Sequence, residues 1–231
     1  MELTRAEHRR KIVAGWAIIV APLLAFAGAV FMPTMDSDEA KWLTNLADGR
    51  DRAIIGLTLT AAAWAVGVFA VLGLAHLLRE RMTLFGLLGS GFAILGMVAS
   101  TAYVGVQAMS LELAGSDVAI GTAATLVEDT LTGPAMIFGL VGLVLFAAGM
   151  LVLTAGLYRA RVIPIASAVG LALFAVAFFV GYQFAITPVV IAATAVLALA
   201  AAPIGWAIVK ETDQAWEHAP QFRGFHPVPT T

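Results

Sequence analysis

The chain has 231 residues, of which 61% are hydrophobic and 12% are charged, and its mean hydropathy is +0.93. Soluble domains carry about 45–50% apolar and about 25% charged residues, so this composition excludes an ordinary soluble domain and favours a protein surrounded by lipid. The lack of cysteine excludes disulfides and thiolate chemistry, and the net charge of −2 gives no support for a nucleic-acid partner.

Six apolar segments are long enough to cross a bilayer, which takes about 20 helical residues. They exceed the length of a barrel strand and do not alternate, so they must be helices whose backbone groups bond within the segment. The sequence therefore predicts an all-α polytopic bundle over residues 1–210, followed by a polar cytoplasmic tail at 211–231. The predicted spans are Ile12–Met32, Ala53–Leu78, Met82–Ser110, Leu131–Tyr158, Val162–Gln183 and Thr187–Val209.

The first span follows a basic segment and includes small residues at Ala27-Gly28-Ala29, as a secretory signal peptide would. A signal peptide has an apolar region of about 7–15 residues, and this segment is longer. We therefore expect it to be a retained span.

Lysine and arginine residues alternate between the two sides of the six predicted spans without a contradiction. Ten lie on the side of the termini, and the positive-inside rule makes that side cytoplasmic. The cytoplasmic set is Arg5, Arg9, Arg10, Lys11, Arg79, Arg81, Arg159, Arg161, Lys210 and Arg223, against Lys41, Arg50 and Arg52 outside. We expect a multi-pass protein with both termini in the cytoplasm.

The first outer loop, Pro33–Arg52, predicts a short amphipathic helix. Glu39 follows Asp36 at the spacing of a capping box, and Gly49 is a suitable residue to end the helix. Trp42, Leu43 and Leu46 would then share one apolar face. Such a helix would lie on the outer membrane surface or cap the bundle.

The other two outer connections differ in length. The acidic second loop, Leu111–Thr130, contains Val118, Leu126 and Val127, which favour another short helix. The third connection is a turn at Phe184–Ile186, which makes the last two spans a tight antiparallel hairpin.

Ionisable residues inside a membrane usually mark function, and the interior of the spans has almost none. His76 lies one turn from a cytoplasmic end and has no second span histidine to hold a haem with it, so a hydrogen-bonded residue is the better interpretation. His218 and His226 do not have the spacing of a metal pair, and the acidic second loop matches no calcium motif. We expect no metal, no cofactor and no catalytic residue, and proton-coupled transport is disfavoured.

Small residues recur on spans three and four, where they let helices approach closely. These faces would hold the bundle together, or would bind another membrane protein or a second copy of the chain; membrane lipids are the other expected partners. The third span carries Gly86, Gly89, Ser90, Ala93, Gly96 and Ser100, and the fourth carries Ala135, Gly139, Gly142 and Gly149.

One set of side chains in the outer half is a candidate ligand site. If spans three and five face each other, their polar residues would line an amphiphilic pocket for a lipid or a small apolar ligand. The alternative is that they are interfacial residues without a specific role, and that Trp64, near the bilayer centre, is a packed bundle residue. The candidate ligand-lining residues are Tyr103, Gln107, Glu112, Tyr182, Gln183 and Trp64.

Two segments carry a resemblance to a known class. The Trp-containing acidic segment from Asp36 to Arg52, and Gly-Leu-Tyr-Arg-Ala-Arg followed by Ile-Pro at Gly156 to Pro164, resemble uncharacterised actinobacterial-type six-span membrane proteins, some grouped as domains of unknown function. The resemblance covers most of the chain. It implies a six-helix bundle in a bacterial plasma membrane and brings no activity.

These observations favour a membrane component without catalytic activity: an accessory or scaffold subunit, or a lipid-binding protein. The alternative is a channel or transporter for an uncharged or amphipathic molecule, which needs a water-accessible path past Trp64, Ser100 and Thr101. A third hypothesis is a membrane enzyme that uses Glu112, Glu128 or Asp129, which requires these carboxylates to converge in a cleft.

Overall fold

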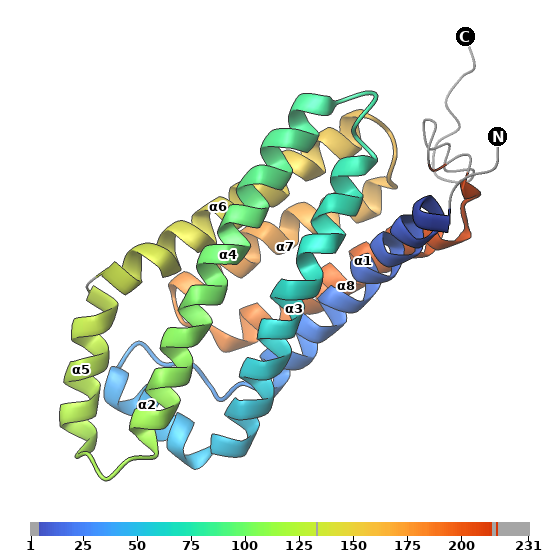
Figure 1. Cartoon of the computed structure of the whole chain (residues 1–231). Coiled ribbons are helices and arrows are strands. Elements are labelled where there is room, and N and C mark those ends of the chain that lie inside the picture. The colour runs from blue at the N-terminus through green and yellow to red at the C-terminus, as the bar shows by residue number, and fades with distance from the viewer. Residues whose placement is uncertain (1–4, 133, 214–215, 217–231) are drawn as a thin grey trace.

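The computed structural model describes residues 5–132, 134–213 and 216, with the backbone alone at 5–7, 131, 132 and 134–137. All regular structure in these stretches is helical, and six helices are long and apolar enough to cross a membrane, so the predicted six-span, all-helical membrane protein is confirmed (Figure 1). The six are α1 (Arg5–Phe31), α3 (Arg50–His76), α4 (Thr83–Ala114), α6 (Pro134–Arg159), α7 (Ile165–Gln183) and α8 (Thr187–Lys210).

The six long helices form a closed ring. Each contacts its two neighbours in the order α1, α3, α4, α6, α7, α8 and back to α1. The helices run alternately up and down, so both described chain ends and the α3–α4 and α6–α7 turns lie at one end, called here the terminal end (Figure 1). The basic residues that flank the spans gather there, including Lys11, Arg79, Arg81 and Arg159.

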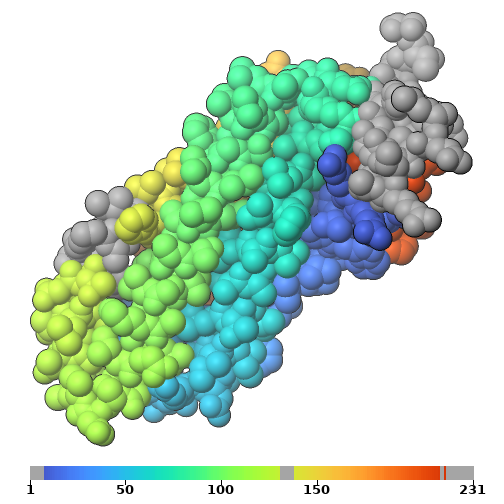
Figure 2. Space-filling model, in the orientation of Figure 1, coloured from blue at the N-terminus to red at the C-terminus, as the bar shows by residue number. Residues whose placement is uncertain are grey.

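The opposite end, called here the loop-helix end, carries two short helices, α2 (Glu39–Asp48) and α5 (Ile120–Thr132). Their apolar faces pack on each other and on α3 and α4, which forms a second small core beside the main one. This core contains Trp42, Leu43, Leu46, Ala53, Leu57, Leu111, Ala123 and Val127. The short helices therefore cover this end of the bundle. Figure 2 shows the whole bundle as an elongated body with α3 and α4 along one face.

The first short helix begins later than the capping box predicts. Asp38 is its N-cap residue, and the Asp38 carboxylate accepts hydrogen bonds from the amides of Ala40 and Lys41. Asp36 instead accepts from the amide of Asp38, so Glu39 is the first helical residue and its carboxylate is not used in a capping box. Gly49 ends the helix as predicted, with its amide donating to the Asn45 carbonyl.

The remaining boundaries shift by a few residues. Helix α4 extends four residues past the predicted Ser110, to Ala114, and α5 ends at Thr132, so that α6 begins only at Pro134. The predicted turn at Phe184–Ile186 does connect α7 and α8, and Ala185 adopts a positive φ of 51° within it.

Helices α4 and α6 make the closest contact in the ring because both present small residues. A Cβ atom at Gly89 would lie 2.7 Å from Cγ of Leu153, and one at Gly142 would lie 2.9 Å from Cβ of Ala99. A Cβ at Gly96 would overlap the backbone of Phe146. The described small residues of these faces are thus occupied within the chain, while the Ala135 side chain lies outside the described residues. A protein partner stays a prediction and would need other helix faces.

At the terminal end, the segment after α8 is attached to the bundle. The Trp216 ring, only 3% exposed, stacks on His76 at 4.3 Å between centroids, and Arg79 donates to the Trp216 carbonyl at 3.0 Å. Asp213 forms an ion pair with Lys11 and contacts Nδ1 of His8 at 2.9 Å. His76 is therefore the packed, hydrogen-bonding residue expected. The rest of the predicted tail, with His218 and His226, lies outside the described residues.

The α4–α6 contact predicts opposite effects for glycines on two faces of α4. Gly96→Ala should lower the free energy of unfolding by about 1–3 kcal/mol, because the added methyl group forces the two backbones apart. Gly91→Ala and Gly105→Ala, at positions with open space around Cβ, should be neutral or stabilising by up to about 1 kcal/mol, since alanine favours a helix. Thermal unfolding in detergent measures the stability of all three variants. Equal effects of the three substitutions would contradict the close packing of α4 on α6 at Gly96.

Candidate functional site

The bundle contains a cavity of about 410 Å³ next to the loop-helix end, called here the loop-helix cavity. This volume lies within the range of about 300–1,000 Å³ that is typical of small-molecule sites. Side chains come from α2 to α7, which makes the cavity a product of the tertiary fold rather than of one segment. Its lining residues are Glu39, Thr60, Trp64, Ser100, Tyr103, Val104, Gln107, Glu128, Gly139, Leu140, Leu143, Phe178, Tyr182 and Gln183.

The lining changes in chemistry along the bundle axis. Trp64, at the middle of α3, and Phe178, one turn before Tyr182 on α7, supply an aromatic floor. Glu39 and Glu128 come from α2 and α5 and therefore lie toward the loop-helix end. Hydroxyl and amide side chains occupy the walls between, among them Gln107. This gradient from apolar to charged matches the gradient of an amphiphilic molecule.

A smaller cavity of about 90 Å³ continues along the ring axis toward the terminal end, called here the axial cavity. All six long helices line it, almost entirely with apolar side chains. Thr60, Trp64, Phe178 and Tyr182 line both cavities, so they lie at the boundary.

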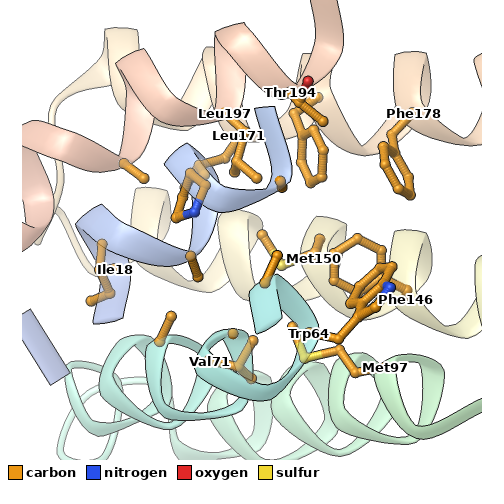
Figure 3. A pocket seen from close by; sticks show the side chains of 18 of the residues that line it. Ile18, Trp64, Val71, Met97, Phe146, Met150, Leu171, Phe178, Thr194 and Leu197 are labelled. Carbon is orange, nitrogen blue, oxygen red and sulfur yellow. The ribbon is translucent and has the colours of Figure 1, made fainter. Parts of the chain in front are cut away.

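An aromatic cluster forms that boundary. The Trp64 ring packs edge-on against Phe146 at 4.9 Å and Phe178 at 6.2 Å, measured between ring centroids. Phe174 lies 5.2 Å from Phe178, and Tyr182 lies 4.7 Å from Phe178 on the other side. Figure 3 shows Trp64, Phe146 and Phe178 gathered at one end of the axial cavity, with Ile18 and Val71 toward the other. The cluster restricts passage between the two cavities.

Five of the six predicted ligand-lining residues line the loop-helix cavity: Tyr103, Gln107, Tyr182, Gln183 and Trp64. Their spacing explains this, because Ser100, Tyr103 and Gln107 follow one another at three and four residues and so share one face of α4. That the face lines a cavity is observed; that a ligand binds there stays a prediction.

Glu112 is the exception among the predicted residues. It lies five residues beyond Gln107, which turns it to a different face of the helix. Its exposed carboxylate accepts a hydrogen bond from Nη2 of Arg50 at 3.0 Å, while Nη1 of Arg50 donates to the Leu111 carbonyl at 2.9 Å. Glu112 therefore holds the start of α3 against the end of α4 and does not line the cavity.

Glu39 is a lining residue that the sequence did not single out as a site residue. The capping-box interpretation assigned its carboxylate to the helix backbone, but as the first residue of α2 it lines the cavity instead. Only the packing of α2 on α5, through Leu43, Leu46 and Val127, brings it near Glu128. The sequence shows that both loops are acidic. It does not show that the two loops pack together and bring Glu39 near Glu128.

Burial raises the pKa of the Glu39 carboxyl above its ordinary value, and the negative charges of Glu128 and Asp38 raise it further. A partly buried carboxylate next to another carboxylate is less stable in its charged form than one in water. Such arrangements are found more often at functional sites than elsewhere.

This arrangement predicts that Glu128→Gln lowers the pKa of Glu39 toward its ordinary value, because one of the two neighbouring charges disappears while the burial remains. Asp129→Asn removes the same charge from the next residue of α5 and should change the Glu39 pKa less. Carboxyl ¹³C NMR over a pH series measures the pKa of Glu39, and loss of its signal in Glu39→Gln assigns the resonance. An unchanged midpoint in Glu128→Gln would contradict the proximity of the two carboxylates.

The site does not have the composition of a metal centre or of the carboxylate cluster required by the enzyme hypothesis. Among the residues described, no three His, Cys, Asp or Glu side chains are grouped to hold a metal ion. Of Glu112, Glu128 and Asp129, only Glu128 lines the cavity. The cavity can hold and orient a molecule, and its polar residues can donate and accept hydrogen bonds.

Comparisons with known proteins add no family to this geometry: no family model, no curated protein and no solved structure matches the chain. The resemblance to actinobacterial-type six-span proteins therefore stays a prediction.

Proposed function

We propose that this chain is a multi-pass protein of the bacterial plasma membrane that binds a lipid or another amphiphile in the loop-helix cavity, as an accessory component without catalytic activity. The observation that carries the proposal is the graded lining of the cavity, from Trp64 and Phe178 to Glu39 and Glu128. An apolar chain would lie on the aromatic floor, and a polar head group would lie among the side chains nearer the loop-helix end.

The charge distribution supports an orientation with both termini in the cytoplasm. The terminal end carries Arg9, Arg10, Lys11, Arg79, Arg81, Arg159, Arg161 and Lys210, while the loop-helix end is mainly acidic. By the positive-inside rule the cavity then lies in the outer half of the membrane. A ligand would come from the outer leaflet or from the external medium.

Filling the cavity tests the proposal. Leu143→Trp adds a large side chain to the cavity lining and should abolish retention of a co-purified amphiphile, because the space for it is lost. The matched control is Leu199→Trp, at a position that is 77% exposed on the outside of α8. Native mass spectrometry of both variants and the wild type, released from nanodiscs, reports the bound mass.

The expected result is one specific adduct on the wild type and on Leu199→Trp, and none on Leu143→Trp. A wild type without any adduct, or an adduct that survives in Leu143→Trp, would contradict amphiphile binding in this cavity. The same spectra report a stable protein partner or a second copy of the chain, which would favour the accessory or scaffold-subunit role.

A channel or transporter for an uncharged or amphipathic molecule is the second candidate. The favouring observation is that the loop-helix and axial cavities share Thr60, Trp64, Phe178 and Tyr182 and so follow one line through the ring. Conduction would require the aromatic cluster to move aside, since Trp64, Phe146 and Phe178 pack against one another. Flux of an uncharged solute into liposomes that contain the protein would distinguish transport from binding.

A further inference from the structure

We propose that the loop-helix cavity selects a cationic amphiphile: a monovalent organic cation with an amine or quaternary ammonium head and an apolar tail. This inference rests on the proposed function, that the cavity binds an amphiphile, and adds the sign of the head group. Four features of the described residues support it: the charge of the lining, the engagement of nearby cations, the aromatic content and the absence of a metal-ligand group.

The charged side chains that line the cavity are all negative. Glu39 and Glu128 line it, and no Lys, Arg or His is among its described lining residues. The two carboxylates belong to different helices, and the packing of α2 on α5 brings them to the same cavity. Glu39 is half-buried and Glu128 is exposed, and a cleft lined by charges of one sign attracts ligands of the opposite sign.

The basic residues of the loop-helix end are directed elsewhere. Arg50 is bound to Glu112 and to the Leu111 carbonyl, and Nη2 of Arg52 donates to the Val30 carbonyl at 3.2 Å. Nζ of Lys41 lies 3.9 Å from the Asp38 carboxylate. None of the three lines the cavity, so an anionic head group would find carboxylates and no basic partner there.

The aromatic side chains suit such a cation. Tyr103, Tyr182, Trp64 and Phe178 all line the cavity, and the faces of aromatic rings attract alkylammonium groups. The two tyrosines come from α4 and α7, which are both neighbours of α6 in the ring, while Trp64 and Phe178 offer an apolar surface to a tail. A head group among Tyr103, Tyr182 and the carboxylates would therefore combine charge attraction with cation–π contact.

A divalent metal ion is a poorer occupant of the same cavity. Calcium takes six to eight oxygen ligands, and magnesium demands octahedral geometry. The lining offers two carboxylates, and the described residues contain no group of three metal-ligating side chains. A cation that needs one or two carboxylates and an apolar surface fits the lining better.

The experiment compares three probes of equal chain length: octyltrimethylammonium, octyl sulfate and octyl glucoside. Isothermal titration calorimetry measures their binding to the full chain in dodecyl maltoside micelles, with empty micelles subtracted. Nonionic micelles avoid the ammonium head groups of common phospholipids. The variants are Glu39→Gln and Glu128→Gln, and the matched control is Asp48→Asn, which removes an exposed carboxylate from the same helix as Glu39.

We expect octyltrimethylammonium to bind about tenfold more tightly than either other probe, as a partly solvated charge pair would give. Glu39→Gln and Glu128→Gln should each weaken binding of the cation several-fold and leave binding of the glucoside unchanged. Asp48→Asn should leave both unchanged. Wild-type-like unfolding temperatures of the variants would show that lost binding is not lost folding.

The outcomes separate the two proposals. If the glucoside or the sulfate binds as tightly as the ammonium probe, or Glu39→Gln binds the cation like the wild type, cation selectivity is wrong while amphiphile binding stands. If calcium chloride displaces the ammonium probe at micromolar concentration, the site is a metal site and the inference is wrong. If none of the probes binds, the proposed amphiphile site itself is contradicted.

Discussion

Close contact between α4 and α6 sets where the interior of the ring is filled and where it is hollow. In a membrane, moving apolar side chains from contact with lipid to contact with another helix gains little free energy. Helices therefore associate through tight packing of small residues. Gly89, Gly96 and Gly149 supply that packing over the half of these helices nearer the terminal end, and Gly142 extends it to Ala99 and Ser100 at the middle of α4. Farther along α4 the side chains that follow are larger and more polar, with Tyr103 in contact range of Gly139, and the cavity lies there. Along α4, the position where small residues give way to large ones is thus also the position where close helix packing gives way to the loop-helix cavity.

The aromatic cluster divides the interior of the ring into two chemically different spaces. Phe146, Phe174 and Phe178 are buried, and their rings interlock with Trp64 at centroid distances of 4.9 to 6.2 Å. On one side the lining is apolar and the space is small; on the other the lining includes hydroxyls, amides and carboxylates. The cluster therefore separates the two spaces, and transport through the ring would require its rearrangement.

The spans and much of the candidate site were predictable because helical periodicity places residues on faces before any tertiary contact is known. Ser100, Tyr103 and Gln107 share a face of α4 by spacing alone. Glu112 was placed wrongly for a reason the same periodicity explains, since it lies on another face and binds Arg50. That Glu39 lines the cavity could not be predicted from the sequence. Its position depends on the packing of α2 against α5, and these helices lie in loops more than 70 residues apart.

If the loop-helix cavity takes up a molecule from outside, Ser100 on its wall must be accessible to water from the side opposite the termini. The chain has no cysteine, so Ser100→Cys would be its single thiol, and Ser167→Cys, at a site 3% exposed near the terminal end of α7, is the control. The decisive measurement is labelling of both variants in intact cells by a membrane-impermeant thiol reagent. We expect Ser100→Cys to be modified from outside and Ser167→Cys to remain unmodified. An unreactive Ser100→Cys, or one modified only after the cytoplasmic side is exposed, would show that the cavity does not open to the outside.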